Sequence, residues 1–324
     1  MPLPTDPKQL ALGEAVLKQF DATFGFHPGF RPAHAHGILV SGEFTPSPDA
    51  ASLTRAPHLT RPSTRVTARF SNSTGLPTLP DTDPNANPRG LAIRFHLAEH
   101  SHTDIVAHST DGFPARTAEE FLELLQAGAA SGQENKESPS PIEKFLASHP
   151  AALAFVQTPK PSPSSFAHEN YFAVNAMRFT NAAGESRYGR YRIAPEAGVE
   201  HLDDAALSAK SPTYLFDELH ERIAGHPLTF HIQVQLAGAG DIVDDATAHW
   251  PKDRPLVDLG KIVLTSLVAD DEREQQQIIF DPIPRIDGIE PSADPLLEQR
   301  AAVYLMSGRR RRKASETSAA SAVR

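Results

Sequence analysis

The stretch RPAHAHGILVSGEF, residues 31–44, predicts a β-strand that opens at His34, because a short apolar run lies between proline and charged residues. Similar runs recur up to residue 108 and again from Tyr171, and connections rich in proline, aspartate and asparagine separate them. The further runs are RVTARFS (65–71), RGLAIRFHL (89–97), TDIVAH (103–108), the hairpin YFAVNAMRFTNAAGESRYGRYRI (171–193), LTFHIQVQL (228–236), VDLGKIVLTSLV (257–268) and QQIIFDPI (276–283).

The order of the expected elements indicates the fold class. Helical spacing of apolar residues occurs at 7–24, 117–130, 140–157 and 213–225, without a regular alternation of strand and helix. We therefore expect an α+β protein, an antiparallel β-barrel of roughly eight strands surrounded by helices. Periodic pattern resumes after each Ser/Pro-rich loop, which favours one domain over two. The expected organisation is a helical arm at 1–23, a single barrel domain at 24–308 and a basic, disordered tail at 309–324.

The composition excludes several classes of protein. Cysteine is absent, so disulfides, zinc–thiolate sites and thiol nucleophiles are excluded. The N-terminus lacks the pattern of a signal peptide and no apolar stretch is long enough to span a membrane, so we expect a cytoplasmic protein. The net charge is −9, and because residues 309–324 carry +5, the rest of the chain carries −14. A chain this acidic is not expected to bind nucleic acid.

Near the other end of the chain, DPLLEQRAAVYLMSG (294–308) has the signals of a helix. Asp294 is a suitable N-cap, Pro295 suits the first turn, and Gly308 is a natural stop. Arg300 and Tyr304 are four residues apart and therefore share one face of the helix. One interpretation is an incidental surface pair; the other is that Tyr304 binds a metal as a phenolate, since a phenol ionises at neutral pH only when a cation holds it, as in tyrosine-ligated haem.

Six further stretches of the sequence form a set of motifs with a defined order and spacing. RPAHAHG, ARFS, NPRGLAIRF, DIVAHS, AHWPKDRPLVDLGKIVL and FDPIPRIDGIEPSADPLLEQRAAVY together make this sequence resemble the catalases, including their small relatives, the catalase-related peroxidases. The resemblance extends from about Phe24 to Arg311. It implies the catalase-type eight-stranded antiparallel barrel, with haem, expected to be haem b, buried between the barrel and the C-terminal helix.

The resemblance also implies roles for particular residues. On the distal side of the haem, His34 is the catalytic histidine and the Ser71 hydroxyl bonds its ring. On the proximal side, Tyr304 is the ligand of the iron and Arg300 is its partner. The propionate-binding arginines fall on Arg31, Arg69 and Arg311, with Arg309 as a competitor of Arg311, and Phe113 and Phe121 are candidate walls of the haem site.

The implied activity is that of a haem-dependent peroxidase. Such an enzyme reduces hydrogen peroxide or organic hydroperoxides with small organic electron donors, through a ferryl haem intermediate. Full-length relatives have an asparagine on the distal side where DIVAHS brings His108 and Ser109, so no amide is present to hold peroxide and we expect weak catalase activity. The expected partners are peroxide and the donor, and the expected assembly is a monomer or homodimer.

Several alternatives stay open on the sequence alone. A catalase-type barrel that rearranges fatty-acid hydroperoxides, like the allene oxide synthases, uses the same tyrosine and histidine. A non-catalytic barrel that carries haem or another apolar ligand needs no distal histidine. His36 competes with His34 for the distal position, since alternate residues of a strand share a face. His100 and His102 suggest a metal site, but a solvated turn is the preferred interpretation.

Overall fold

The computed structural model describes residues 3–132 and 138–322, with side chains described as far as Ala314. Its helices are α1 (Pro7–Phe24), α2 (Ala50–Leu53), α3 (Ala118–Ser131), α4 (Pro141–Ser148), α5 (Pro150–Gln157), α6 (Asp204–Ser208), α7 (Tyr214–Gly225), α8 (Asp271–Gln277) and α9 (Pro295–Ala322). Its strands are β1 (Gly37–Pro46), β2 (Thr64–Ser71), β3 (Gly90–Ala98), β4 (Ser101–His108), β5 (Tyr171–Phe172), β6 (Met177–Thr180), β7 (Ser186–Pro195), β8 (Leu228–Leu236), β9 (Leu256–Leu267) and β10 (Ile289–Pro291).

Eight antiparallel strands close into a barrel. The order β7-β5-β4-β3-β2-β1-β9-β8 is completed by pairing of β8 with β7, while β6 and β10 extend the sheet from β7. This confirms the expected fold class. Aromatic rings pack the barrel core: Phe70 lies 5.1 Å from Phe166 and 6.0 Å from both Tyr171 and Phe230, between ring centroids. Because aromatic side chains bury large apolar areas, these contacts stabilise a closed barrel rather than an open sheet.

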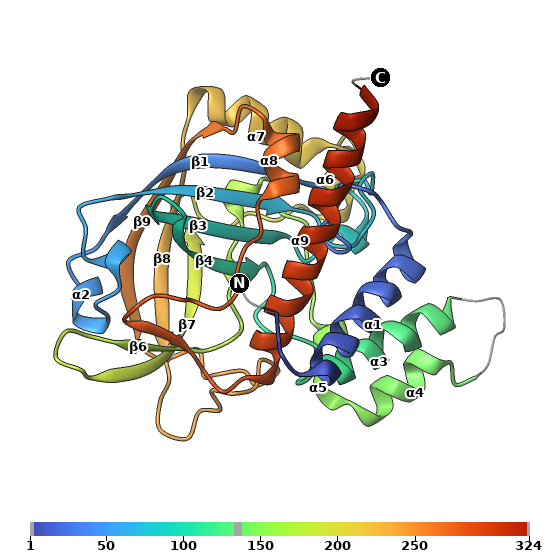
Figure 1. The fold of residues 1–324 in the computed structure, drawn as a ribbon, viewed down its shortest axis with the longest axis horizontal. Coiled ribbons are helices and arrows are strands. Elements are labelled where there is room, and N and C mark those ends of the chain that lie inside the picture. The colour runs from blue at the N-terminus through green and yellow to red at the C-terminus, as the bar shows by residue number, and fades with distance from the viewer. Residues whose placement is uncertain (1–2, 133–137, 323–324) are drawn as a thin grey trace.

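The helices α1, α3, α4, α5 and α9 gather on one side of the barrel. In Figure 1, α9 crosses in front of the strands, and α1, α3, α4 and α5 form a lobe beside it. Gly13 allows α1 and α9 to approach closely, since a Cβ atom at this position would lie 3.2 Å from Met306 and 3.3 Å from Gln299. Arg310 of α9 also pairs with Asp21 of α1 at 2.7 Å. The helices α1 and α9, which are far apart in the sequence, therefore pack against each other.

The helix at the C-terminus differs from the expectation. Gly308 does not end it, because α9 continues to Ala322; the expected disorder of the tail stays a prediction, and residues 323 and 324 lie outside the described residues. Gly308 instead makes room for a neighbour, since a Cβ atom there would lie 2.2 Å from Ile279 Cδ1. Arginine and lysine, which follow Gly308, have high helix propensity and allow the helix to continue.

Three further expectations need correction. The region 140–157 is two helices, because Pro150 cannot continue the first one and begins the second. The run at 276–283 is not a strand: α8 ends at Gln277 and an extended segment outside the sheet follows. The first strand begins at Gly37 rather than at His34, whose φ angle of 55° places it in the left-handed region. The other expected strands and helices are confirmed within a few residues.

Candidate active site

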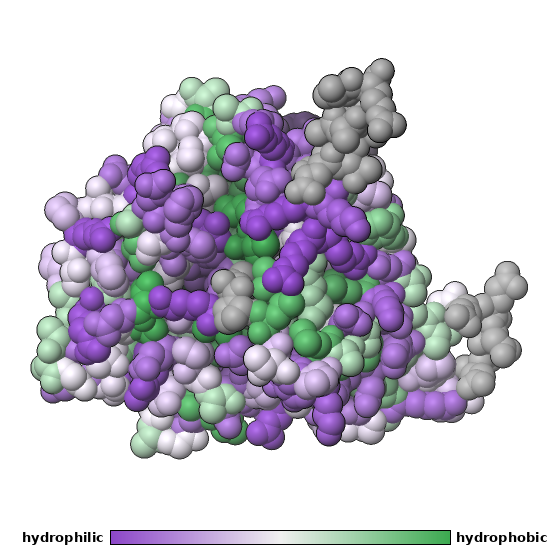
Figure 2. Space-filling model, in the orientation of Figure 1, coloured by the Kyte–Doolittle hydropathy of each residue, from purple (hydrophilic) through white to green (hydrophobic). Residues whose placement is uncertain are grey.

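A cavity lies between the barrel and the helices that cover it. It holds about 1410 Å³ of atom-free space, including part that is open to solvent. The barrel contributes residues at the ends of β2, β3 and β4, and α1 and α3 contribute apolar side chains. One face of α9 also lines it, at intervals of three and four residues from Leu296 to Arg311. In Figure 2, apolar surface is visible beside α9, and hydrophilic side chains gather over the middle of this helix.

His34 and Ser71 meet on the barrel side of the cavity. His34 Nδ1 lies 3.1 Å from Ser71 Oγ. Gly90, on the neighbouring strand, is required for this contact, because a Cβ atom there would lie 2.5 Å from Ser71 Oγ and 2.8 Å from His34 Nδ1. Burial, and then the positive charge of Arg69, lower the pKa of His34 to about 4. The imidazole is therefore neutral at pH 7. Its contact with Ser71 involves Nδ1 and leaves Nε2 unbonded to the serine.

Arg300 and Tyr304 meet on the helix side of the cavity. Arg300 Nη2 lies 3.1 Å from the Tyr304 hydroxyl oxygen and its Nε lies 3.4 Å away. Arg300 also donates to Asn175 Oδ1, and Asn175 donates to Asp294 Oδ2 at 2.7 Å. Asp294 in turn accepts a hydrogen bond from Leu296 N at 2.9 Å, as an N-cap does. One chain of hydrogen bonds therefore fixes both the start of α9 and the arginine beside the tyrosine.

Asn175 was missed by the sequence analysis. It lies in the loop between β5 and β6, more than a hundred residues before its partners Asp294 and Arg300. Neither spacing nor composition marks it, so no local signal in the sequence could have found it.

Three buried guanidinium groups lie together at one edge of the cavity. Arg31, Arg69 and Arg311 all line it, and each one's positive charge lowers the pKa of another. Burial is the largest cause of these shifts, and together with Arg311 it lowers the pKa of Arg69 to about 9. Within the described residues, none of the three is paired with a carboxylate at 4.0 Å or less, and Arg311 Nε has no hydrogen-bond partner. Three mutually repelling cations in one buried place form a site for an anion.

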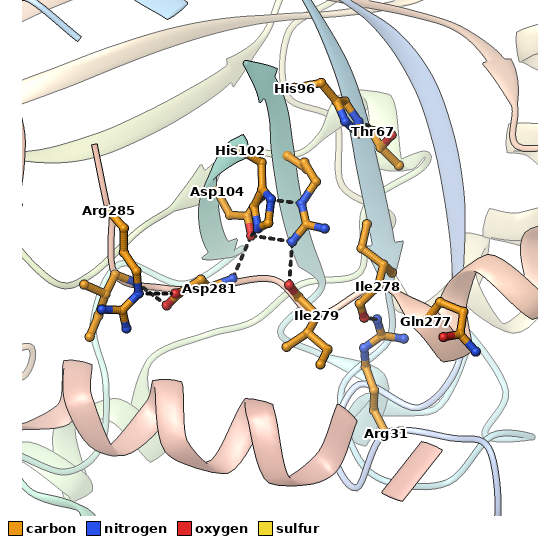
Figure 3. Close-up of polar contacts among 12 residues, drawn as sticks. Arg31, Thr67, His96, His102, Asp104, Gln277, Ile278, Ile279, Asp281 and Arg285 are labelled. Atoms are coloured by element: carbon orange, nitrogen blue, oxygen red, sulfur yellow. Dashed lines mark hydrogen bonds and ion pairs between the residues drawn. The ribbon is translucent and has the colours of Figure 1, made fainter. Parts of the chain in front are cut away.

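The extended segment 278–281, which we call the strap, closes the cavity beside these arginines. Arg31 and Arg311 donate to the carbonyl oxygen of Ile278 at 3.2 and 2.9 Å. Figure 3 shows Arg31 directed at Ile278 and Asp104 bonded to the backbone of Asp281, a contact of 2.7 Å. The strap thereby presents Ile279 and Phe280 to the cavity.

Of the other candidate haem-site residues, Phe113 and Phe121 line the cavity and Arg309 does not. Phe113 and Phe121 line the cavity and pack together at 5.3 Å between centroids, and Val16 and Phe20 of α1, which the sequence analysis did not identify, join them there. Arg309 is exposed and does not line the cavity, unlike Arg311.

The other histidines behave differently from one another. His36 points away from the cavity and stacks on Phe216 at 3.8 Å, because residues 34–36 precede the strand and do not share its alternation. His108 lines the cavity, whereas His100 and His102 do not. No group of three or more metal-ligating side chains of His, Cys, Asp or Glu occurs in the described part of the chain.

Comparisons with known proteins identify the family of the chain. A family model for catalase matches residues 29–318. The chain belongs to the catalase family. A catalase-related peroxidase of Mycolicibacterium paratuberculosis is 34% identical over 91% of this chain and 93% of its own length, and a catalase-related peroxidase of Synechococcus elongatus is 32% identical over 91% and 87%. Mouse catalase is 29% identical, and the match covers 85% of this catalase-family chain and 54% of the mouse protein.

Solved structures support the family's fold. A bacterial catalase superposes with a TM-score of 0.76 at 23% identity, over 95% of this chain and 62% of that one. A fungal catalase gives a TM-score of 0.75 at 24% identity, over 91% and 62%. The family is one of oxidoreductases and implies a haem cofactor. Among the helices described, none in this catalase relative is long and apolar enough to cross a membrane.

Proposed function

We propose that the chain is a haem-dependent peroxidase that reduces hydrogen peroxide or organic hydroperoxides with small organic electron donors. The observation that carries this proposal is that a single cavity unites His34 and Ser71 on one side with Arg300 and Tyr304 on the other. A carrier of an apolar ligand would have no use for this pairing of a neutral imidazole with an arginine-bonded phenol.

The residues of the cavity fit a haem group. Haem has a flat apolar ring with two carboxylates at one edge, and the cavity combines apolar walls with three buried arginines at one edge. Arg311 Nε has no hydrogen-bond partner among the described residues, and the pKa values of Arg31 and Arg69 are lowered. Both observations support binding of an anion beside these arginines. We infer that Arg31, Arg69 and Arg311 would bind the propionates, Phe113 and Phe121 would pack against the ring, and the Tyr304 oxygen would be the ligand of the iron.

The haem iron, when bound, supplies the centre at which a peroxide exchanges electrons. His34 moves the proton. In the tautomer in which Nδ1–H donates to Ser71 Oγ, its Nε2 atom accepts the proton of the peroxide O–H group and returns it to the oxygen that leaves as water or as an alcohol. The low pKa of His34 keeps Nε2 able to accept that proton throughout the neutral range. Arg300 donates a hydrogen bond to the Tyr304 hydroxyl oxygen and thereby holds the phenol in place on the helix side of the cavity.

Catalase activity is proposed to be weak beside peroxidase activity. The position that carries an amide in full-length relatives is His108 here, and an imidazole with one nitrogen engaged offers a single N–H group, whereas an amide offers two. The second peroxide that catalase turnover consumes is therefore held less well. We also propose that the protein is cytoplasmic and that it is a monomer or homodimer. Gel filtration with light scattering tests the oligomeric state directly.

The test is an absorption titration of the purified protein with haem b, followed by donor oxidation with hydrogen peroxide and with an alkyl hydroperoxide. We expect one haem per chain and oxidation of the donor. His34→Leu should load haem yet lose donor oxidation by about 100-fold or more, whereas His36→Leu should keep it. Failure to take up haem, or undiminished activity of His34→Leu, would contradict the proposal, and a rearranged hydroperoxide without donor oxidation would assign the alternative reaction.

A further inference from the structure

Four residues lie side by side across the barrel where His34 covers it. Gly37 pairs with Ser71, Ser71 with Gly90, and Gly90 with His108, so these positions form one row across β1, β2, β3 and β4. Directly paired residues of neighbouring strands project from the same face of a sheet. Ser71 and His108 therefore point to the same side, with only a glycine between them.

The gap at Gly90 is occupied by His34. Neighbouring strands are spaced by about 4.8 Å, so the backbones at Ser71 and His108 are about 10 Å apart. A Cβ atom on Gly90 would lie 2.8 Å from His34 Nδ1 and 3.1 Å from its Cε1 atom, which places the His34 ring directly over the glycine. The ring is bonded to Ser71 on one side of the row, and His108 stands on the other side. Both histidines line the cavity.

The protonation pattern of His108 is fixed by its own loop. The backbone N–H of Thr110 donates to His108 Nδ1 at 3.3 Å. A backbone N–H group can only donate, so Nδ1 carries a lone pair and a neutral ring bears its proton on Nε2. Burial, followed by the charge of His34, lowers the pKa of His108 to about 3, so the ring stays neutral. His108 thus has one nitrogen occupied and one N–H group available.

We propose that His108 is a positioning residue that donates a hydrogen bond from Nε2–H to the peroxide held beside His34. This inference rests on the proposed function of the cavity. The two imidazoles are complementary: His34 offers an acceptor and takes the peroxide proton, whereas His108 offers a donor and keeps its own. A ligand that presents both an O–H group and a lone pair, as every hydroperoxide does, satisfies both rings at once.

Fluoride bound to the haem-loaded ferric protein is a probe of this donor, because it takes the place of the peroxide oxygen and accepts hydrogen bonds. We would measure its dissociation constant from the absorption spectrum for the wild type, His108→Asn and His108→Leu. Asparagine and leucine have nearly the same shape, and only asparagine has an N–H donor. We expect His108→Leu to bind fluoride about 10- to 100-fold more weakly and His108→Asn to bind within about threefold of the wild type.

A second pair of variants and a control keep the test decisive. If His108→Leu fails to fold or to load haem, His108→Gln and His108→Met provide another pair of similar length, with and without a donor. His100→Asn is the control, because His100 is exposed at the turn before β4, away from the cavity, with a φ of 59° that asparagine tolerates. A protein that takes up no haem would overturn the proposed function. Haem-loaded variants that bind fluoride equally, with and without the donor, would overturn the role of His108 alone.

Discussion

Replacing His58 by leucine should make the protein more resistant to acid. His58 is 2% exposed and lies between two phenylalanine rings, with centroids 4.6 Å from Phe95 and 6.2 Å from Phe44. Its Nδ1 atom has no hydrogen-bond partner among the described residues. Burial, and to a smaller extent the charge of Arg61, lower its pKa from 6.5 to about 3. The folded protein therefore resists protonation of this ring, whereas the unfolded chain does not.

The sign and size of the effect follow from the shift. Because the folded-state pKa is lowered, the unfolded chain binds a proton first as the pH falls below 6.5, and stability is lost progressively until about pH 3. The full shift of about 3.5 units corresponds to roughly 4.8 kcal/mol. A pH of 4.5 lies two units below the unfolded-state pKa of 6.5. At this pH, His58 alone therefore lowers the free energy of unfolding by about 2.7 kcal/mol relative to neutral pH.

The assay is urea unfolding at pH 7.5, 5.5 and 4.5, followed by tryptophan fluorescence of the single Trp250 and by circular dichroism. We expect the advantage of His58→Leu over the wild type to increase by about 2.7 kcal/mol between the first and last conditions. His100→Asn serves again as the control and should follow the wild type. Equal pH dependence in His58→Leu and the wild type would refute the reasoning, because it would mean that the ring is protonated equally in both states.

Three further predictions concern the cavity. Tyr304→Phe should lower haem affinity by about 10-fold or more and change the spectrum of any haem that binds, because the proposed oxygen ligand of the iron is removed; an unchanged spectrum would argue against iron ligation. Arg311→Leu should weaken haem loading about 10-fold through loss of one propionate partner, as a haem titration measures, whereas the exposed Arg309→Leu should not. His108→Asn should raise oxygen release relative to donor oxidation several-fold, because the amide offers a second N–H group; a constant ratio in an oxygen-electrode assay would contradict this.

The strands of the barrel were predictable because their evidence is local. Alternating apolar residues, bounded by proline, glycine and aspartate, mark β3 and β8 almost to the residue. The strap was not predictable in the same way. Its apolar run suggests a strand, but its carbonyl groups are satisfied by guanidinium groups from residues as distant as Arg31 and Arg311. Backbone hydrogen bonds to side chains far away in the sequence leave no periodic pattern.

The candidate site was also predictable only in part. The resemblance identified residues that the structure brings into one cavity, including His34, Tyr304 and Arg311. It did not identify Val16 and Phe20, because apolar residues in an amphipathic helix carry no sign of what their face covers. Gly308 was misjudged for a related reason: a glycine that ends a helix and a glycine that admits a neighbouring side chain look the same in a sequence.

The docking of α1 onto α9 has a consequence for biosynthesis. Val16 lies near the start of the chain and Arg311 near its end, yet both form walls of the same cavity. The ribosome synthesises α1 long before α9, so a growing polypeptide has no finished pocket until Arg311 has been translated. We therefore expect haem to bind only after α9 has left the ribosome, so that cells short of haem accumulate the haem-free protein.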